Sequence, residues 1–319
     1  MKKLVVLDSF SVNSGDFKWD NIINLVDKTE IYDVTKTHEI LDRIKDATYV
    51  FSCKTPITKE VIEKCENIKY IGSMATGFNH IDVEVCENRN IVVTNIPDYS
   101  TNAVSELVFA FIFEAYRKVL AHNERVQNGE WITCKDFCFY DKSVSEIYGK
   151  TLGIIGYGNI GKRVSQIADV LGMNVLVYTR SKRENVGNIK FVSLNEVLEN
   201  SDLISLHCPL TKDTKEIINE NTIGKMKDGV IIINTARGQL INEEHLAKAL
   251  KSKKVSKAFL DVVYKEPMIK DNPLLNIENC IITPHYGWCP IETRKRLFTI
   301  LEENLKSFIE GNTINKVKL

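Results

Sequence analysis

The chain has 319 residues, enough for two domains, and its apolar (44%) and charged (26%) fractions are those of an ordinary globular protein. Lysine plus arginine (42) equals aspartate plus glutamate (42), so no overall field attracts nucleic acid or an anionic membrane. No apolar run is long enough to cross a bilayer, and the short run after Lys3 meets Asp8 too early for a secretory signal. These features predict a cytoplasmic protein with no membrane or nucleic-acid partner.

The eight cysteines indicate neither a metal site nor a disulfide framework. None belongs to a C-x-x-C pair, and Cys134 and Cys138 have no second pair at zinc spacing. We therefore expect free thiols in a reducing compartment and no bound metal.

Short strand-like runs and helix-compatible segments alternate through the first hundred residues, which is typical of β/α units. The runs are Leu4–Leu7, Tyr49–Phe51, Tyr70–Ile71 and Ile91–Thr94. Asn102 is then a candidate cap for an apolar helix over residues 102–120, which connects to a second domain.

A glycine-rich segment follows the first strand of that second domain. Gly156, Gly158 and Gly161 stand in the pattern Gly-x-Gly-x-x-Gly, between an apolar run and an amphipathic helix. Such glycines permit a tight turn, the approach of a pyrophosphate and close helix packing, and the N–H groups at the helix start face the phosphates. The segment predicts a dinucleotide site.

From Thr151 onward the alternation is regular and favours a doubly wound parallel sheet with helices on both faces. Six runs are expected as strands: Leu152–Ile155, Val175–Tyr178, Leu203–Leu206, Val230–Ile233, Ala258–Val263 and Cys280–Ile282. Residues 291–310 form a last amphipathic helix, and the chain that follows is too short for a third domain. We expect this helix to return to the first domain. The dinucleotide-binding domain, residues 102–287, is then inserted between residues 1–101 and 288–319 of a substrate domain.

Three polar side chains follow late strands of the predicted sheet, where open α/β sheets bind their ligands. Arg237, in Asn-Thr-Ala-Arg-Gly, can bind a carboxylate through two hydrogen bonds, although a surface arginine in a turn fits the same fragment. Glu266 and His285 each stand beside a proline. A carboxylate next to a histidine favours the imidazolium form and makes a tunable acid/base, whereas His285 alone is more typical of a structural histidine.

Together these motifs resemble the D-isomer-specific 2-hydroxyacid dehydrogenase family. The ordered set Gly-x-Gly-x-x-Gly, Asn-Thr-Ala-Arg-Gly, Glu-Pro and Pro-His covers nearly the whole chain. Four further segments are similar to the glycerate dehydrogenase/hydroxypyruvate reductase branch: residues 54–56, residues 75–79, residues 136–139 and Trp288. The resemblance implies an α/β protein, with a Rossmann domain inserted into a flavodoxin-like α/β substrate domain. It also implies an oxidoreductase that transfers a hydride between a nicotinamide cofactor and a small 2-oxo or 2-hydroxy acid.

The resemblance implies roles for individual side chains as well. Arg237 would bind the substrate carboxylate and polarise the 2-oxo group. His285 would exchange a proton with the carbonyl oxygen, and Glu266 would orient His285 and keep it protonated for reduction. On the substrate side the resemblance adds the backbone N–H groups of Ala75, Thr76 and Gly77 and, less specifically, the side chain of Lys54.

Cofactor contacts follow from the same match. Besides the three glycines they are Asn159, Ile160, Thr179, Arg180, Ser181, Cys208, Pro209, Thr214, Thr235 and Asp261. Asp261 would accept a hydrogen bond from the carboxamide, whereas Cys208 and Pro209 are equally consistent with packing or turn formation. His207 is interpreted as structural or cofactor-adjacent.

The stretch after the second strand of the inserted domain indicates which cofactor is bound. NAD sites hold the ribose hydroxyls with an acidic residue about twenty residues after the glycines, but here no acid occurs before Glu184. Arg180 and Ser181 can bind a 2′-phosphate, and Lys182 and Arg183 add positive charge. We therefore expect NADP; the alternative is a solvated basic turn, with NAD still used.

The expected substrate is hydroxypyruvate or glyoxylate, reduced to D-glycerate or glycolate. Another 2-oxo acid, such as pyruvate, is a close alternative, because the bulky Tyr286 beside the histidine narrows the pocket. Formate or phosphite oxidation and a nucleotide-sensing corepressor are further uses of the same fold. Relatives form twofold dimers through the region of the apolar helix, so a homodimer is expected.

Overall fold

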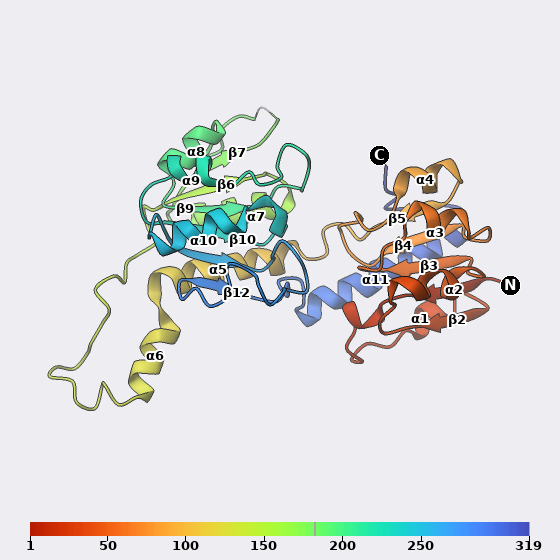
Figure 1. Cartoon of the computed structure of the whole chain (residues 1–319), viewed down its shortest axis with the longest axis horizontal. Helices are drawn as coiled ribbons and strands as arrows, with labels where there is room; N and C mark the ends of the chain where they lie inside the picture. The colour runs from red at the N-terminus through yellow and green to blue at the C-terminus, as the bar shows by residue number, and fades with distance from the viewer. Residues whose placement is uncertain (182, 319) are drawn as a thin grey trace. The chain divides into compact units, whose positions relative to one another are not determined.

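The computed structural model describes residues 1–181 and 183–318 and divides the chain into two compact units. Unit 1 contains Met1–Tyr99 and the chain from Cys289 onward, and unit 2 contains Ser100–Trp288 (Figure 1). The chain passes from unit 1 to unit 2 after residue 99 and returns after residue 288. The sequence predicts these two boundaries after residues 101 and 287. Lys182, for which a positive charge near the cofactor is predicted, lies outside the described residues.

Unit 1 is built on a five-stranded parallel sheet in the order β2-β1-β3-β4-β5. Its strands are β1 (Lys3–Val6), β2 (Lys28–Ile31), β3 (Tyr49–Ser52), β4 (Tyr70–Ser73) and β5 (Val92–Thr94). Its helices are α1 (Asp20–Ile23), α2 (Ile40–Ile44), α3 (Lys59–Glu63), α4 (Val83–Asn88) and α11 (Ile291–Ile309), with 3-10 turns at Ser9–Ser11 and Thr37–Glu39. This strand order is the flavodoxin-like one.

The two faces of the unit 1 sheet carry different side chains, because successive residues of a strand point to opposite faces. Val5, Val50 and Ile71 lie on the face that packs against an aliphatic core shared with α2, α3 and α4. On the other face the ring of Tyr70 lies 4.8 Å from the ring of Phe308. Helix α11 therefore covers this second face, so the last helix of the chain packs within the first unit.

Unit 2 contains a seven-stranded parallel sheet in the order β12-β11-β10-β9-β6-β7-β8. Its strands are β6 (Thr151–Ile155), β7 (Asn174–Tyr178), β8 (Ile189–Phe191), β9 (Leu203–Leu206), β10 (Val230–Asn234), β11 (Val255–Leu260) and β12 (Cys280–Ile282). Its helices are α5 (Thr101–Arg117), α6 (Val119–Gln127), α7 (Asn159–Val170), α8 (Leu194–Asn200), α9 (Glu220–Lys225) and α10 (Glu243–Lys251), with a 3-10 turn at Gly238–Leu240. Six strands follow the Rossmann order, and β12 extends it.

Helices cover both faces of this sheet (Figure 1). One core cluster joins the sheet to α5 and α7 through residues such as Phe111 and Val164. A second cluster on the other face joins it to α8, α9 and α10, with Val197, Ile223 and Leu246 as examples. The predicted doubly wound sheet is therefore confirmed.

Details of the predicted elements differ from the structure in four places. Strand β11 covers Val255–Leu260, whereas the sequence predicts Ala258–Val263, so residues 261–263 belong to the segment that follows the strand. The edge strands β2 and β8 are not expected from the sequence. Helix α5 begins at Thr101 after the cap residue Ser100, so Asn102 lies within the helix and does not cap it. The expected helix over residues 102–120 is broken at Lys118, whose φ of +51° ends α5 and starts α6. In the described chain no helix is long and apolar enough to span a membrane.

Candidate active site

Six strands of the unit 2 sheet end in one row. The paired residues across this row are Tyr178, Ile155, Leu206, Asn234, Leu260 and Ile282. Because the strands are parallel, the segments that follow them leave the sheet at the same edge. These segments carry every predicted site residue of unit 2 except Thr214, which comes a little later in the chain.

His285 and Glu266 form a direct pair at this edge. The His285 Nδ1 atom lies 2.7 Å from Glu266 Oε2, and Glu266 Oε1 accepts a 3.3 Å hydrogen bond from the Val263 N–H. An ionised carboxylate only accepts hydrogen bonds, so the proton of this contact belongs to Nδ1. The Nε2 atom of His285 has no partner among the residues described. The pair is thus the arrangement that orients an imidazole for proton exchange at Nε2.

The backbone that carries His285 is held in the left-handed region, with φ +53°. Asp261, only 2% exposed, supports it by accepting hydrogen bonds from Thr283 Oγ1 at 2.7 Å and from the N–H groups of residues 286 and 287 at 3.0 Å. The indole N–H of Trp288 donates to the His285 carbonyl at 2.9 Å. Asp261 was expected to contact the carboxamide; that contact stays a prediction, and the structure gives this carboxylate a different set of partners.

Arg237 stands in a loop clamped by the side chain of Asn234. The Asn234 amide donates to the Arg237 carbonyl at 2.9 Å and accepts from the Ala236 N–H at 3.0 Å. The guanidinium donates to the Ala236 carbonyl at 2.6 Å, and no carboxylate within the described chain forms an ion pair with it. Gly238 then packs directly on the backbone of Val263, where an added Cβ would lie 1.9 Å from the carbonyl carbon. The Arg237 loop and the segment leading to Glu266 therefore adjoin.

The glycine loop after β6 has the shape that a bound pyrophosphate needs. Gly156 has φ +103°, and a Cβ there would lie 2.5 Å from the backbone of His207 and Cys208. A Cβ on Gly161 would lie 2.2 Å from the Gly156 carbonyl oxygen, so α7 can start here only with glycine at this position. A Cβ on Gly158, in contrast, meets no atom within 4 Å. The loop packs tightly at its two ends and leaves open space in the middle.

The residues around this loop fit a dinucleotide. Asn159 and Ile160 begin α7, whose first N–H groups have no intrahelical acceptor, and the Ile160 side chain packs on the core. The hydroxyl of Thr235 is buried and finds no hydrogen-bond partner in the part of the chain described. Buried polar atoms are nearly always paired, so this hydroxyl indicates a ligand group at its position.

The segment after β7 is basic, as the sequence indicates. Thr179 is partly exposed, and Arg180 and Ser181 are exposed. The Arg183 guanidinium lies 5.3 Å from the ring centre of Tyr157, a residue of the glycine loop. A cation–π contact at this distance holds the basic segment close to the glycine loop.

The segment after β9 is held by its own hydrogen bonds. Burial lowers the pKa of His207 to about 3, and His207 Nε2 lies 2.8 Å from Ser205 Oγ, so the imidazole is neutral near pH 7. Burial raises the pKa of the Cys208 thiol to about 11, which keeps it protonated. The hydroxyl of Thr214 donates to the Pro209 carbonyl at 2.6 Å and closes the turn. These contacts support the structural interpretation of His207 and leave the predicted cofactor contacts as predictions.

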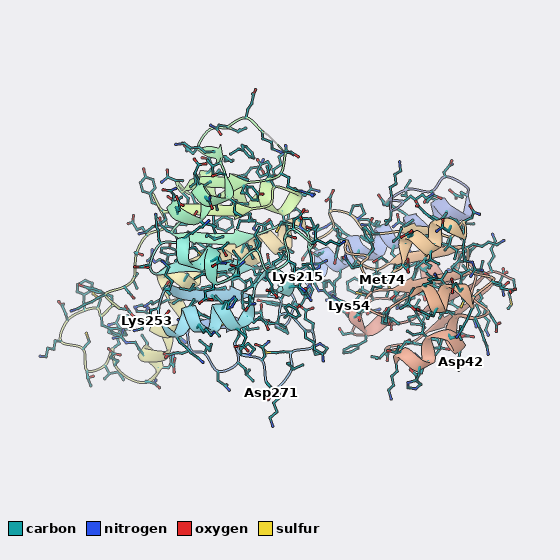
Figure 2. The ribbon with its side chains drawn as sticks, turned by 45° about the horizontal axis from the view of Figure 1, so that its top comes forward. Asp42, Lys54, Met74, Lys215, Lys253 and Asp271 are labelled. Carbon is teal, nitrogen blue, oxygen red and sulfur yellow. The ribbon has the colours of Figure 1, made fainter. Side chains whose placement is uncertain are left out.

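The remaining predicted residues lie in unit 1, at the carboxyl edge of its own sheet. Lys54 follows β3 and residues 75–77 follow β4, and these two strands are joined at their ends by a 2.8 Å hydrogen bond from the Met74 N–H to the Ser52 carbonyl (Figure 2). The Lys54 side chain is exposed and has no partner among the described residues. The N–H groups of Ala75, Thr76 and Gly77 likewise have no acceptor there. Unit 1 thus presents one ammonium and a run of three unpaired N–H groups at neighbouring strand ends.

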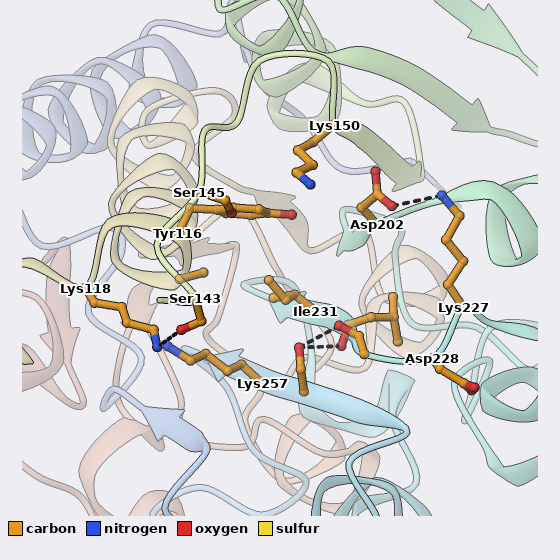
Figure 3. Close-up of a pocket in the computed structure, with 14 residues that line it drawn as sticks. Tyr116, Lys118, Ser143, Ser145, Lys150, Asp202, Lys227, Asp228, Ile231 and Lys257 are labelled. Carbon is orange, nitrogen blue, oxygen red and sulfur yellow. Dashed lines mark hydrogen bonds and ion pairs between the residues drawn. The ribbon is translucent and has the colours of Figure 1, made fainter. Parts of the chain in front are cut away.

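A cavity of about 440 Å³ lies at the opposite edge of the unit 2 sheet, where the strands begin (Figure 3). Lys118, Lys150, Lys227 and Lys257 line it, but Lys118 and Lys227 are paired with Asp141 and Asp202. None of the predicted site residues borders this cavity. Ligands of doubly wound sheets bind at the carboxyl ends of the strands, so this cavity is not the candidate active site.

Sequence reasoning missed two carboxylates that shape the site. Glu243, at the start of α10, accepts a hydrogen bond from the Tyr264 N–H at 2.7 Å and another from the Asn272 amide at 2.9 Å, and so holds the loop that contains Glu266. Asp8, directly after β1, binds the loop that contains Lys54. The position of Asp8 at a strand end is a signal that the sequence does carry.

The fold, the glycine loop and the histidine–carboxylate pair define a dinucleotide-dependent oxidoreductase. Residues 109–287 match the family model described as "D-isomer specific 2-hydroxyacid dehydrogenase, NAD binding domain". The chain is 45% identical over 320 residues to a hydroxypyruvate reductase from Blautia hydrogenotrophica, a match that covers 99% of each. The protein belongs to the D-isomer specific 2-hydroxyacid dehydrogenase family, and it is an NAD(P)-dependent enzyme that acts on CH–OH donors.

Solved structures agree with this assignment. An acyclic imino acid reductase in complex with NADPH and D-Arg matches with a TM-score of 0.88 and 34% identity, over 99% of this chain and 100% of that one. A D-lactate dehydrogenase from Aquifex aeolicus, complexed with NAD and lactic acid, matches with a TM-score of 0.85 and 31% identity, over 98% and 96% of the two chains. The resemblance stated from the sequence is confirmed, and so is a nicotinamide cofactor.

The contact between the Arg237 loop and the Glu266 segment leads to a test by substitution. Gly238→Ala places a methyl group inside the backbone of residues 263–264, and overpacking of this kind costs about 1–3 kcal/mol. We expect urea unfolding to show a lower free energy of unfolding for this variant. The control is Gly224→Ala in α9, where a Cβ meets nothing within 4 Å and stability should be unchanged or slightly raised. Equal stability of the two variants would contradict close packing of Gly238 on the backbone of Val263.

Proposed function

We propose that the protein reduces hydroxypyruvate or glyoxylate with NADPH as the hydride donor. The observation that carries the proposal is the 2.7 Å pair of His285 and Glu266 on the same sheet edge as the glycine loop. The name of the 45% identical relative, hydroxypyruvate reductase, supports the choice of substrate. Pyruvate remains the nearest alternative, supported by the D-lactate dehydrogenase among the similar structures.

Arg237 binds the substrate carboxylate in this proposal. Its guanidinium has no competing carboxylate in the described chain, and a planar guanidinium matches a carboxylate through two parallel hydrogen bonds. The clamp from Asn234 fixes the loop before the substrate arrives, which reduces the entropy lost on binding. The same charge lies close to the 2-oxo group of a bound 2-oxo acid and polarises it.

His285 donates the proton. A bound nicotinamide supplies the hydride for the carbonyl carbon, and the alkoxide oxygen that forms must be protonated. The Nε2–H of His285 gives this proton during reduction, and Nε2 takes it back during oxidation. Glu266 keeps its hydrogen bond to Nδ1–H throughout, so the ring holds one orientation in both directions.

Unit 1 contributes substrate-binding groups. The unpaired N–H groups of Ala75, Thr76 and Gly77 are donors without acceptors in the described chain, which suits the binding of a carboxylate. Lys54 binds the carboxylate or, in hydroxypyruvate, the 3-hydroxyl.

The cofactor residues follow from the fit of the glycine loop. Gly158 and the start of α7 would hold the pyrophosphate, because a Cβ on that glycine meets no protein atom within 4 Å. Thr235 offers its unpaired hydroxyl on the nicotinamide side. Cys208, Pro209 and Thr214 would border the riboses.

NADP is the proposed cofactor because the segment after β7 contains cations where NAD sites have an acid. Arg180 and Ser181 bind the 2′-phosphate, and the contact of Arg183 with Tyr157 keeps a second guanidinium near the glycine loop. Thr179 contributes to the same segment.

We also propose a homodimer formed through α6 and residues 128–148. This arm extends away from the rest of unit 2 (Figure 1), and α6 has no buried residue. Its exposed apolar side chains are Val119, Leu120, Trp131, Ile132, Phe137, Tyr140 and Tyr148. Ile132 is 87% exposed and Phe137 is 82% exposed, and such a concentration of apolar surface is typical of an interface.

The activity is tested with a panel of 2-oxo acids and both reduced cofactors. We expect NADPH oxidation with hydroxypyruvate or glyoxylate.

The roles of the two catalytic side chains are tested by substitution. His285→Ala should lower kcat by about 10²–10⁴-fold, the usual contribution of a positioned proton donor. Arg237→Ala should raise KM and also lower kcat, because it binds both ground and transition states. His38→Ala, on an exposed 3-10 turn, is the control. NADPH binding without turnover of any acid would favour the corepressor interpretation.

Cofactor preference is tested by comparing kcat/KM for NADPH and NADH. The wild type should prefer NADPH. Arg180→Ala should lower the NADPH value about ten- to a hundredfold, the loss expected for one or two charge-assisted hydrogen bonds, and leave the NADH value nearly unchanged. Arg163→Ala on the exposed face of α7 should change neither. A wild type that prefers NADH would show that NADP is the wrong assignment.

The dimer is tested by light scattering at micromolar concentration. We expect twice the mass of the 36.3 kDa chain. Leu120→Glu should give monomers, because a charge would be buried without a partner at the interface. Val170→Glu replaces an isolated apolar residue that is 86% exposed at the end of α7 and should leave the dimer intact. A monomeric wild type would rule out this assembly.

A further inference from the structure

Asp8 is a buried carboxylate with all of its hydrogen bonds directed to one loop. It follows β1 and is 4% exposed. Its Oδ1 atom accepts from the Cys53 N–H at 2.8 Å. Its Oδ2 atom accepts from the N–H groups of Lys54 and Thr55 at 2.7 Å each and from the Thr55 hydroxyl at 2.9 Å. No lysine or arginine of the described chain forms an ion pair with it.

The carboxylate therefore shapes the β3–α3 loop. Three consecutive N–H groups turn toward one side chain, which fixes the backbone on both sides of Lys54. Because these N–H groups are occupied, the ammonium is the one donor of Lys54 that remains for a ligand. Burial and then the Asp8 charge raise the pKa of the Cys53 thiol to about 12, which agrees with a negative charge close to this loop.

The proposed substrate-binding residues of unit 1 follow β3 and β4, which lie in the same sheet as β1, the strand before Asp8. Residue pairs Val6–Phe51 and Phe51–Gly72 place β1, β3 and β4 in register, so Asp8, Lys54 and residues 75–77 leave adjacent strands at one edge. A flexible lysine side chain loses much rotamer entropy when it binds, and a fixed backbone limits that loss to the side chain itself.

We propose that Asp8 is a positioning residue for substrate recognition, which acts by holding Lys54 in place. The proposal rests on the function proposed above. Asp8 itself touches neither substrate nor cofactor. Its loss should therefore weaken substrate binding and leave the chemical step nearly intact.

The experiment is a double-mutant cycle with Asp8→Asn and Lys54→Met, measured with hydroxypyruvate. The Asp8→Asn substitution replaces one carboxylate oxygen, an acceptor, by an NH2 group, a donor. This NH2 group faces N–H groups of the loop, so the loop loses at least one strong hydrogen bond. We expect Asp8→Asn to raise KM about tenfold, the equivalent of one such bond, with kcat within about twofold of the wild type. Lys54→Met should raise KM similarly. The double variant should be no worse than Lys54→Met alone, because the two residues act through one contact.

Two further variants distinguish a local effect on the Lys54 loop from a general loss of stability. Thr55→Val removes only the fourth hydrogen bond to Asp8 and should raise KM by a smaller factor. Glu30→Gln neutralises another paired carboxylate of unit 1, 3.0 Å from the Lys3 ammonium, and should leave KM unchanged. Amide hydrogen exchange should show faster exchange at residues 53–55 in Asp8→Asn and not in Glu30→Gln.

Each contrary result has its own meaning. An unchanged KM in Asp8→Asn, or an effect of Asp8→Asn that is as large in the Lys54→Met background as in the wild type, would overturn the positioning role. Unchanged exchange at residues 53–55 would overturn it without reference to activity. A wild type that reduces no 2-oxo acid would instead reject the proposed function, while the exchange data would still report on the loop.

Discussion

The register of parallel strands is the constraint on which the site depends. In unit 2 the row from Tyr178 to Ile282 makes six strands end at the same level, so loops separated by more than a hundred residues leave one edge together. Helices cover both faces of this sheet, which leaves its carboxyl edge as the place for polar loops. This register, and not a full set of direct contacts, places four parts of the site at one edge: the glycine loop, Arg237, Glu266 and His285.

The sequence predicts those parts whose signal lies within a few neighbouring residues. The long buried strands of unit 2 appear as apolar runs, and β9 and β12 have the expected bounds. Strand β2 (Lys28–Ile31) is missed because it is an edge strand with two charged residues, and its pairing with β1 decides its conformation. Strand β8 has only three residues and also lies at an edge. Their formation depends on tertiary pairing, which no local pattern shows.

The same distinction applies to the site. Glycines, Arg237, Glu266 and His285 stand in short motifs whose chemistry is readable from the sequence. Asp8 and Glu243 have no motif, because each acts by accepting N–H groups from a loop that is distant in the chain. The hydroxyl of Thr235 is recognised as buried and unpaired only in the folded structure. Residues that perform chemistry are therefore easier to find than the residues that hold them.

Three carboxylates hold the loops that carry the predicted site residues, and each supports a different loop. Asp8 holds the Lys54 loop, Glu243 holds the loop that contains Glu266, and Asp261 holds the left-handed turn at His285. A non-glycine residue at positive φ costs about 1–3 kcal/mol, a strain that persists only where the surroundings enforce it. The three hydrogen bonds that Asp261 accepts from residues 283–287 offset such a cost. A carboxylate offers two acceptor oxygens and no donor, whereas an amide offers one acceptor oxygen and one donor group, so carboxylates suit positions that face only donors.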